Sequence, residues 1–247
     1  MHTSRAAIGH HDRVEVLREV WTRAIATQPP PSAGIVLGAA LAAVVLVLVP
    51  RLWPVARHVV TIAHEGAHGL AALLSGRRLA GIRLHSDTSG LTVSSGRPTG
   101  IGMVLTSFAG YVGPAVLGLA SAAMLSAGRA AGLLWGLLVL LALLLVQIRN
   151  WFGLWLILVS GAVVFAASWW LPPRGLSAFA YLVTWFLLLA APRPVLELQT
   201  KRWRGQARDS DADQLARLTG IPGILWVGVF LAVTVGVAVV GGRMVLG

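Results

Sequence analysis

Two histidines and a glutamate interrupt an apolar stretch of the chain with the spacing H-E-x-x-H: His64, Glu65 and His68. On a helix, positions i and i+4 lie on one face about one turn apart, so both imidazoles can bind the same zinc ion. Glu65 then projects beside them, where it can take a proton from water that the metal has acidified and pass it to a leaving nitrogen. The pattern therefore indicates metal-dependent hydrolysis.

The position of this motif adds to its meaning. Residues 59–76 otherwise read as a membrane helix, and an ionisable group in a span is costly unless it faces a bundle interior or a water-filled cavity. Two other interpretations stay open: the histidines could form structural hydrogen bonds between helices, or they could bind zinc without proteolysis. The chain has no cysteine, so a metal site must use His, Asp, Glu or Asn side chains.

Long apolar helices would carry these residues. The chain has 247 residues, of which 56% are hydrophobic and 12% charged, and the apolar residues come in blocks close to the roughly 20 that span a bilayer. We expect an all-α, polytopic transmembrane helical bundle that occupies residues 33–247. Six or seven spans fit, near residues 33–50, 53–75, 101–125, 131–148, 152–171, 176–192 and 222–241.

Residues 1–32 are expected to form a cytoplasmic amphipathic arm. Their charges are spread over the region where a cleavable signal peptide needs an apolar core. The apolar residues before the proline run at 29–31 follow a helical spacing: Val14, Leu17, Val20, Trp21 and Ile25. This spacing predicts a short helix that lies on the membrane surface and ends at the prolines.

The net charge of +11 comes mainly from arginines in short loops, which favours membrane orientation over nucleic-acid binding. With seven spans, the arm, residues 76–100 and residues 193–217 lie on one face and hold most of the Lys and Arg residues. By the positive-inside rule, we expect this face and the N-terminus to be cytoplasmic, in a multi-pass protein of the cell (plasma) membrane. The sequence carries no signal for an oligomeric state.

Residues 76–100 read as a β-hairpin. Apolar residues alternate with polar ones on both sides of a turn at residues 87–90, and they are Ile82, Leu84, Leu91 and Val93. An edge strand beside a membrane active site could hold an extended peptide through backbone pairing. A surface hairpin without this role is an equal alternative, and His85 within it is expected to be a solvated loop residue.

With these features the chain resembles the site-2 protease family of intramembrane zinc metalloproteases, and within it the shorter membrane-peptidase-like branch of actinobacteria and plants. The resemblance covers about residues 55–240. Besides H-E-x-x-H and the hairpin, it includes GYVGPAVLG at 110–118, RNWFG at 149–153 and SDADQLARLTGIPGILW at 210–226. It implies a zinc cofactor, a transmembrane protein as the substrate, and regulated release of a membrane-tethered factor.

The third zinc ligand is where the chain departs from that family. Better-known members supply an Asp from an Asn-Pro-Asp-Gly or Leu-Asp-Gly sequence, which is absent here. Glu197, at the inner end of the sixth expected span, and Asp211, which opens a short helix, are equal candidates. For Asp211 the alternative is a first-turn acid that binds free amides after the N-cap Ser210. Asn150 is a further candidate, as a weak ligand or a substrate-binding amide, and a plain turn residue is its alternative.

We therefore expect a zinc metalloendopeptidase that hydrolyses peptide bonds of membrane-embedded substrates in the lipid bilayer. His64 and His68 would be metal ligands and Glu65 the catalytic residue. One alternative is a catalytically inactive zinc-binding scaffold, which the missing Asp-Gly sequence favours. The other is a transporter, which the lack of internal repeats disfavours.

Overall fold

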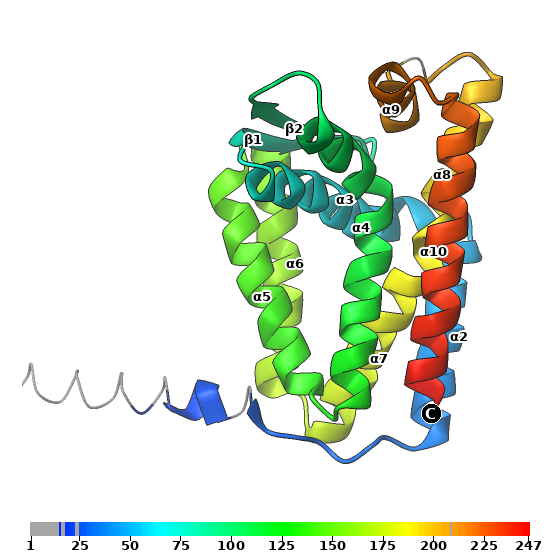
Figure 1. The fold of residues 1–247 in the computed structure, drawn as a ribbon. Helices are drawn as coiled ribbons and strands as arrows, with labels where there is room; N and C mark the ends of the chain where they lie inside the picture. Colours follow the sequence, from blue (N-terminus) through cyan, green and yellow to red (C-terminus); the bar gives the residue numbers. More distant parts are fainter. Residues whose placement is uncertain (1–14, 16–17, 23–24, 208) are drawn as a thin grey trace, which may run out of the picture.

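The computed structural model describes residues 15, 18–22, 25–207 and 209–247. They form a helical bundle with one small antiparallel sheet (Figure 1). In chain order the elements are α2 (Ala33–Leu48), α3 (Trp53–Leu74), β1 (Arg78–Leu84), β2 (Gly90–Ser95), α4 (Ile101–Ser126), α5 (Ala130–Gln147), α6 (Trp151–Trp170), α7 (Pro173–Ala190), α8 (Pro192–Trp203), α9 (Asp211–Thr219) and α10 (Gly223–Leu246). The expected helical membrane architecture with a hairpin after the H-E-x-x-H helix is confirmed.

The number of spans depends on how α2 and α3 are counted. Among the described residues, five helices are individually long and apolar enough to cross a membrane: α4, α5, α6, α7 with its continuation α8, and α10. α2 and α3 qualify only as a pair, with a bend of 100° between them, so there are six candidate spans at most. The helix with the histidines is not a separate seventh span, and in Figure 1 it lies across the direction of α4 and α10.

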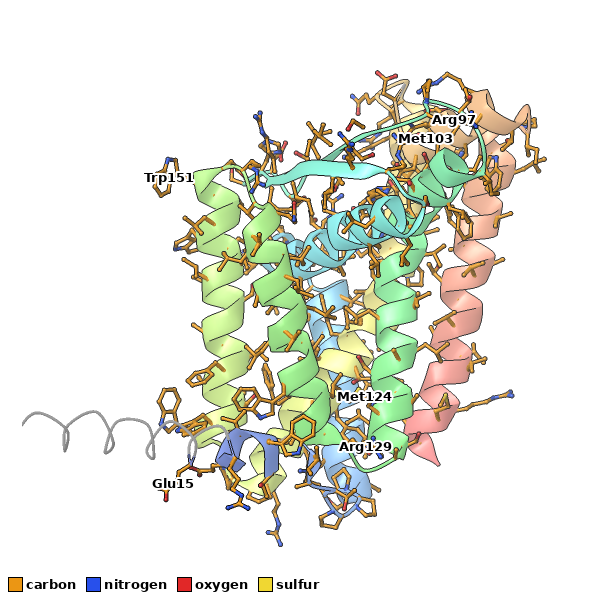
Figure 2. All side chains as sticks on the ribbon, turned by 60° about the vertical axis from the view of Figure 1, so that its left-hand side comes forward. Glu15, Arg97, Met103, Met124, Arg129 and Trp151 are labelled. Atoms are coloured by element: carbon orange, nitrogen blue, oxygen red, sulfur yellow. The ribbon has the colours of Figure 1, made fainter. Side chains whose placement is uncertain are left out.

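The bundle has two ends with different contents. The hairpin and α9 lie at one end, which we call the hairpin end, and the C-terminus lies at the other, which we call the loop end (Figure 1). In Figure 2, Arg97 and Trp151 mark the hairpin end, whereas Arg129 and Met124 mark the loop end. The site described below is therefore assembled at one end of the bundle.

The N-terminal segment joins the loop end. The Gln28 N–H donates to the Gly128 carbonyl at 2.7 Å, and the Ala131 N–H donates to Gln28 Oε1 at 3.2 Å. The expectation that the arm shares a face with residues 76–100 is therefore wrong. It required α3 to make a crossing of its own, and without that crossing the arm and the hairpin lie at opposite ends.

The expected helix in the arm is only partly within the described residues. Glu15, residues 18–22 and Ile25 are helical, whereas Val14 and Leu17 lie outside the described part of the chain. Trp21 and Ile25 are exposed. For these two described positions the structure agrees with a helix that carries apolar side chains on its surface.

Small residues allow α3 and α4 to cross closely. A Cβ atom on Gly113 would lie 2.2 Å from the Cβ of Ala67, a separation that two carbon atoms cannot adopt. Gly113 precedes Pro114, which lies inside α4. The close crossing brings the backbone of α4 directly over the face of α3 that carries the H-E-x-x-H motif.

Three hydrophobic clusters fix the elements around this crossing. The largest fills the bundle between α2, α4, α5 and α7, and includes Ala43, Leu134 and Leu188. The second packs α9 against α4, α8 and α10 through Val112, Leu198, Leu215 and Phe230. The third holds β1 against α3 and α6 through Ile62, Ile82, Leu84 and Ile157. Both non-membrane parts, the hairpin and α9, thus have their own apolar contacts with the bundle.

Candidate metal centre

The two histidines of the motif lie side by side on α3. Their Nε2 atoms are 3.1 Å apart, and their rings meet edge to face with centroids 4.6 Å apart. His68 is buried, and its Nδ1–H donates to the Thr106 carbonyl of α4 at 2.7 Å. This hydrogen bond fixes the ring and leaves Nε2 as the free nitrogen, as is usual for a histidine that binds a metal.

Asp211 reaches the histidines from α9. Its Oδ2 lies 3.4 Å from Nε2 of His64 and 3.2 Å from Nε2 of His68. One ligand atom from each of these three residues falls within 4.8 Å of the others, a separation that could hold a metal ion. Burial disfavours the charged carboxylate, but the two imidazoles outweigh it and hold the pKa of Asp211 well below its usual range. The three side chains together offer two imidazole nitrogens and one carboxylate oxygen as ligand atoms.

Ser210 directly precedes Asp211 at the start of α9. It is the N-cap of α9, and its hydroxyl oxygen accepts from the backbone N–H of Asp213. Asp213 in turn accepts from Ser210 and pairs with Arg202 of α8. The carboxylate of Asp213 thus holds the start of α9 to Ser210 and Arg202, whereas that of Asp211 lies beside His64 and His68 and not on the free amides of the first turn.

Gly110 of α4 provides the space for the centre. A Cβ atom at this position would lie 2.3 Å from Nε2 of His68 and 2.7 Å from Cε1 of His64. Any larger side chain would therefore occupy the region into which both imidazoles point. Gly110 therefore lets α4 pack directly against the two imidazoles, which with the carboxylate match the protein donor set of a catalytic zinc site.

Glu65 is buried next to the histidines, with 5% of its surface exposed. The hydroxyl of Thr92 on β2 donates to Glu65 Oε2 at 2.6 Å. Gly90, the first residue of the same strand, approaches so closely that a Cβ there would lie 2.5 Å from Oε1. The hairpin therefore touches the centre through the carboxylate of Glu65.

Aromatic rings from two other helices close one side of the centre. Tyr111 of α4 lies edge-on to His64 with ring centroids 4.9 Å apart, and it stacks on Phe230 of α10 at 5.0 Å. Sequence reasoning singled out neither these rings nor Gly110 as site residues. The Gly110 and Gly113 pair within GYVGPAVLG was a signal for close helix contact that could have placed α4 beside the motif.

Glu197, the other acidic candidate, lies in a different cluster. Its Oε1 accepts from Trp53 Nε1–H at 2.7 Å, and its Oε2 pairs with Arg57 Nε at 3.2 Å. Arg193, one turn earlier on α8, is 3.4 Å from Oε1 and lies over the Trp53 ring. The structure therefore brings Asp211, and not Glu197, to the two histidines.

Asn150 supports the hairpin. Its Nδ2–H donates to the Leu84 carbonyl at 2.7 Å, and its Oδ1 accepts from the Leu84 N–H at 3.1 Å. The neighbouring Arg149 N–H donates to the Ile82 carbonyl at 2.9 Å. Both polar ends of the Asn150 amide are thus used by β1, and His85 in the hairpin turn is exposed, as expected.

One of three comparisons with known proteins identifies a family for the chain. No curated protein and no solved structure matches the chain. A family model described as Peptidase M50B-like matches residues 37–241, a range that holds the H-E-x-x-H motif, the hairpin and Asp211. The expected relation to the site-2 proteases is thereby confirmed, and the chain belongs to the Peptidase M50B-like family.

Proposed function

We propose that this chain is a zinc-dependent intramembrane protease that hydrolyses peptide bonds of transmembrane protein substrates. His64, His68 and Asp211 would hold the zinc ion, and Glu65 would be the catalytic base. The observation that carries the proposal is the carboxylate of Asp211, which comes from a distant helix to within 3.4 Å of both imidazoles. This carboxylate fits the role of the third ligand that the sequence left open, and its place supports an active protease over an inactive scaffold.

In the proposed reaction, a bound zinc ion and Glu65 have separate roles. A zinc ion bound there would supply Lewis acidity, which makes water more acidic and a peptide carbonyl more electrophilic. Glu65 accepts the proton that the attacking water loses as its oxygen bonds to the carbonyl carbon. Glu65 then delivers this proton to the nitrogen as the C–N bond breaks, so the products are a carboxylic acid and an amine.

The outer edge of β2 is the place where we propose that an extended substrate binds. The outer edge of β1 is already used, because residues 148–150 form a backbone bridge and hydrogen bonds with Ile82 and Leu84. Among the described elements, β2 pairs only with β1. A substrate strand added to β2 would lie beside the strand that contacts Glu65, with its scissile bond near the centre.

We also propose that the hairpin end faces the cytoplasm. Basic residues concentrate there: the hairpin region and α9 hold Arg77, Arg78, Arg83, Arg97 and Arg217, and Arg149 and Arg202 contact these two elements. The loop end has Arg18, Arg129, Arg174 and Arg243. By the positive-inside rule this bias makes the hairpin end cytoplasmic, and it puts the N-terminal arm outside, in place of the cytoplasmic arm that seven spans required.

Orientation can be tested with single cysteines, because the chain has none of its own. Ser86→Cys lies in the exposed hairpin turn and Ser126→Cys at the exposed end of α4. On intact cells, a membrane-impermeant maleimide should label Ser126→Cys and should label Ser86→Cys only after the cells are opened. The reverse labelling pattern would overturn the proposed orientation.

The catalytic proposal is tested with the full-length protein in detergent, loaded with zinc and given fluorescein-labelled casein as an unfolded substrate. Glu65→Gln should retain zinc and lose cleavage by about 10²- to 10⁴-fold, the usual contribution of a general acid–base. Glu15→Gln, on the exposed part of the arm, is the matched control and should cut at the wild-type rate. Zinc binding without any cleavage that depends on Glu65 would instead identify an inactive scaffold.

A further inference from the structure

The carboxylate of Glu65 is held by a single strand. Thr92 Oγ1 lies 2.6 Å from Glu65 Oε2 and 3.1 Å from the backbone carbonyl of Glu65. A hydroxyl has one proton to donate, and of these two oxygens the charged Oε2, which is also the nearer, is the stronger acceptor. Gly90 lies against Oε1 of the same carboxylate, since a Cβ on Gly90 would come within 2.5 Å of that atom.

This strand is itself fixed on two sides. Thr92 pairs with Ile82 in the hairpin register, and Ile82 is buried against α3 and α6. At the turn, Arg57 of α3 donates to the hydroxyl of Thr88, and Thr61 of α3 donates to the Thr88 carbonyl at 2.9 Å. The Thr92 hydroxyl therefore belongs to a strand that is fixed by its contacts with α3 and β1. A hydroxyl fixed in this way can hold the Glu65 carboxylate within a narrow range of geometries.

We propose that Thr92 is a positioning residue for the reaction and acts through Glu65, an inference that rests on the proposed proteolytic function. Its hydroxyl binds Oε2 and so fixes the rotation of the carboxylate that exchanges a proton with water and the leaving nitrogen. Without the hydroxyl, the buried carboxylate loses its hydrogen-bond donor and can rotate about its last torsion. The Glu65 carboxylate is then present but is no longer held in the orientation that the reaction needs. The rate of the chemical step therefore falls, while substrate binding persists.

Three variants test this role in the zinc-loaded full-length protein with fluorescein-labelled casein. Thr92→Val removes the hydroxyl and keeps the shape, whereas Thr92→Ser keeps the hydroxyl. Thr184→Val is the matched control, because this Thr is fully buried in α7 and its hydroxyl donates to the Ala180 carbonyl of its own helix. It should change neither kcat nor KM.

Thr92→Val should lower kcat by about 10- to 100-fold, as is typical when an outer partner of a metal-site residue is lost. Its KM and zinc content should stay at the wild-type values, because the missing interaction acts in the chemical step. Thr92→Ser should restore most of kcat. In a Glu65→Gln background, Thr92→Val should cause no further loss, since Thr92 acts through the carboxylate.

The results that contradict the two proposals differ. Cleavage that depends on Glu65 but is unchanged in Thr92→Val overturns the role of Thr92 alone. The same holds if Thr92→Ser is as slow as Thr92→Val, or if Thr92→Val still slows the Glu65→Gln variant. Equal cleavage by wild type and Glu65→Gln overturns the proposed function, and the role of Thr92 falls with it. If Thr92→Val does not fold, Thr92→Ala takes its place, and a kcat equal to that of Thr92→Ser overturns the role of Thr92.

Discussion

Two carboxylates lie close to α3, and the groups around them differ in one property. Glu197 is bound by Arg57 and Arg193, whose guanidinium groups stay protonated in proteins and offer only donors. Asp211 faces His64 and His68, whose imidazoles can lose a proton and become metal ligands. The carboxylate of the first cluster lies beside two permanent cations, whereas that of the second lies beside imidazoles that can give up a proton to a bound divalent cation. This difference separates a structural ion pair from a metal centre.

Replacing each carboxylate in turn tests this difference most directly and should give the largest effect. Asp211→Asn should lower zinc affinity by at least about 100-fold and abolish cleavage, because a charged ligand is lost. Glu197→Gln should retain zinc, since Glu197 neutralises Arg57 and Arg193. Zinc bound per protein after dialysis, measured by elemental analysis, distinguishes them. Loss of zinc in Glu197→Gln with retention in Asp211→Asn would reverse the assignment of the third ligand.

The space beside the imidazoles gives the next largest effect. In Gly110→Ala, the new methyl group would overlap both rings, so we expect zinc affinity and cleavage to fall by about 10- to 100-fold in a folded protein. Gly228→Ala is the control, because nothing lies within 4 Å of a Cβ at this position of α10. Zinc titration of both variants checks the prediction. Equal affinities would mean that α4 does not shape the metal site.

Asp213 extends the comparison to a third carboxylate and gives the smallest effect. Burial disfavours its charged form, but hydrogen bonds from Ser210 and Arg202 outweigh it and hold the pKa of Asp213 below its usual range. Because the folded-state pKa is lowered, the stabilisation is complete above the ordinary carboxyl pKa and is lost as the pH falls through the lowered value.

This pH dependence can be measured as thermal unfolding of the zinc-free protein between about pH 6 and about pH 3. Over this range the wild type should lose more stability than Asp213→Asn, by less than about 1 kcal/mol because the pair with Arg202 is partly exposed. Asp213→Asn has no carboxylate left to titrate there, so it serves as the reference. Parallel curves for the two proteins would show that Asp213 does not contribute to holding α9.

The sequence was sufficient wherever the signal was local. The H-E-x-x-H spacing predicted two imidazoles on one helical face, and His64 and His68 lie there. The alternation around residues 87–90 predicted the hairpin, and β1 and β2 form it. Both features depend on periods of a few residues, which fix side-chain direction before any tertiary contact is made.

The choice between Glu197 and Asp211 could not be made in this way. Both acids lie between the sixth and seventh expected spans, and only the packing of α8 and α9 decides which one faces the two histidines. Likewise, hydropathy alone made α3 a separate span, whereas its bend after α2 moved the arm to the opposite end. No sequence pattern indicated a role for Thr92, because its contact with Glu65 forms only when the folded hairpin packs on α3.

The place of Asp211 in the chain also bears on when the centre can form. A ribosome makes the protein from the N-terminus, so both histidines and Glu65 enter the membrane long before α9 is translated. Until then the nascent chain has two of the three metal donors, and α10 must still follow to pack against α9. Under the proposed function, the nascent chain would lack the third ligand during its own insertion, when unfolded membrane segments of other newly made proteins are close by.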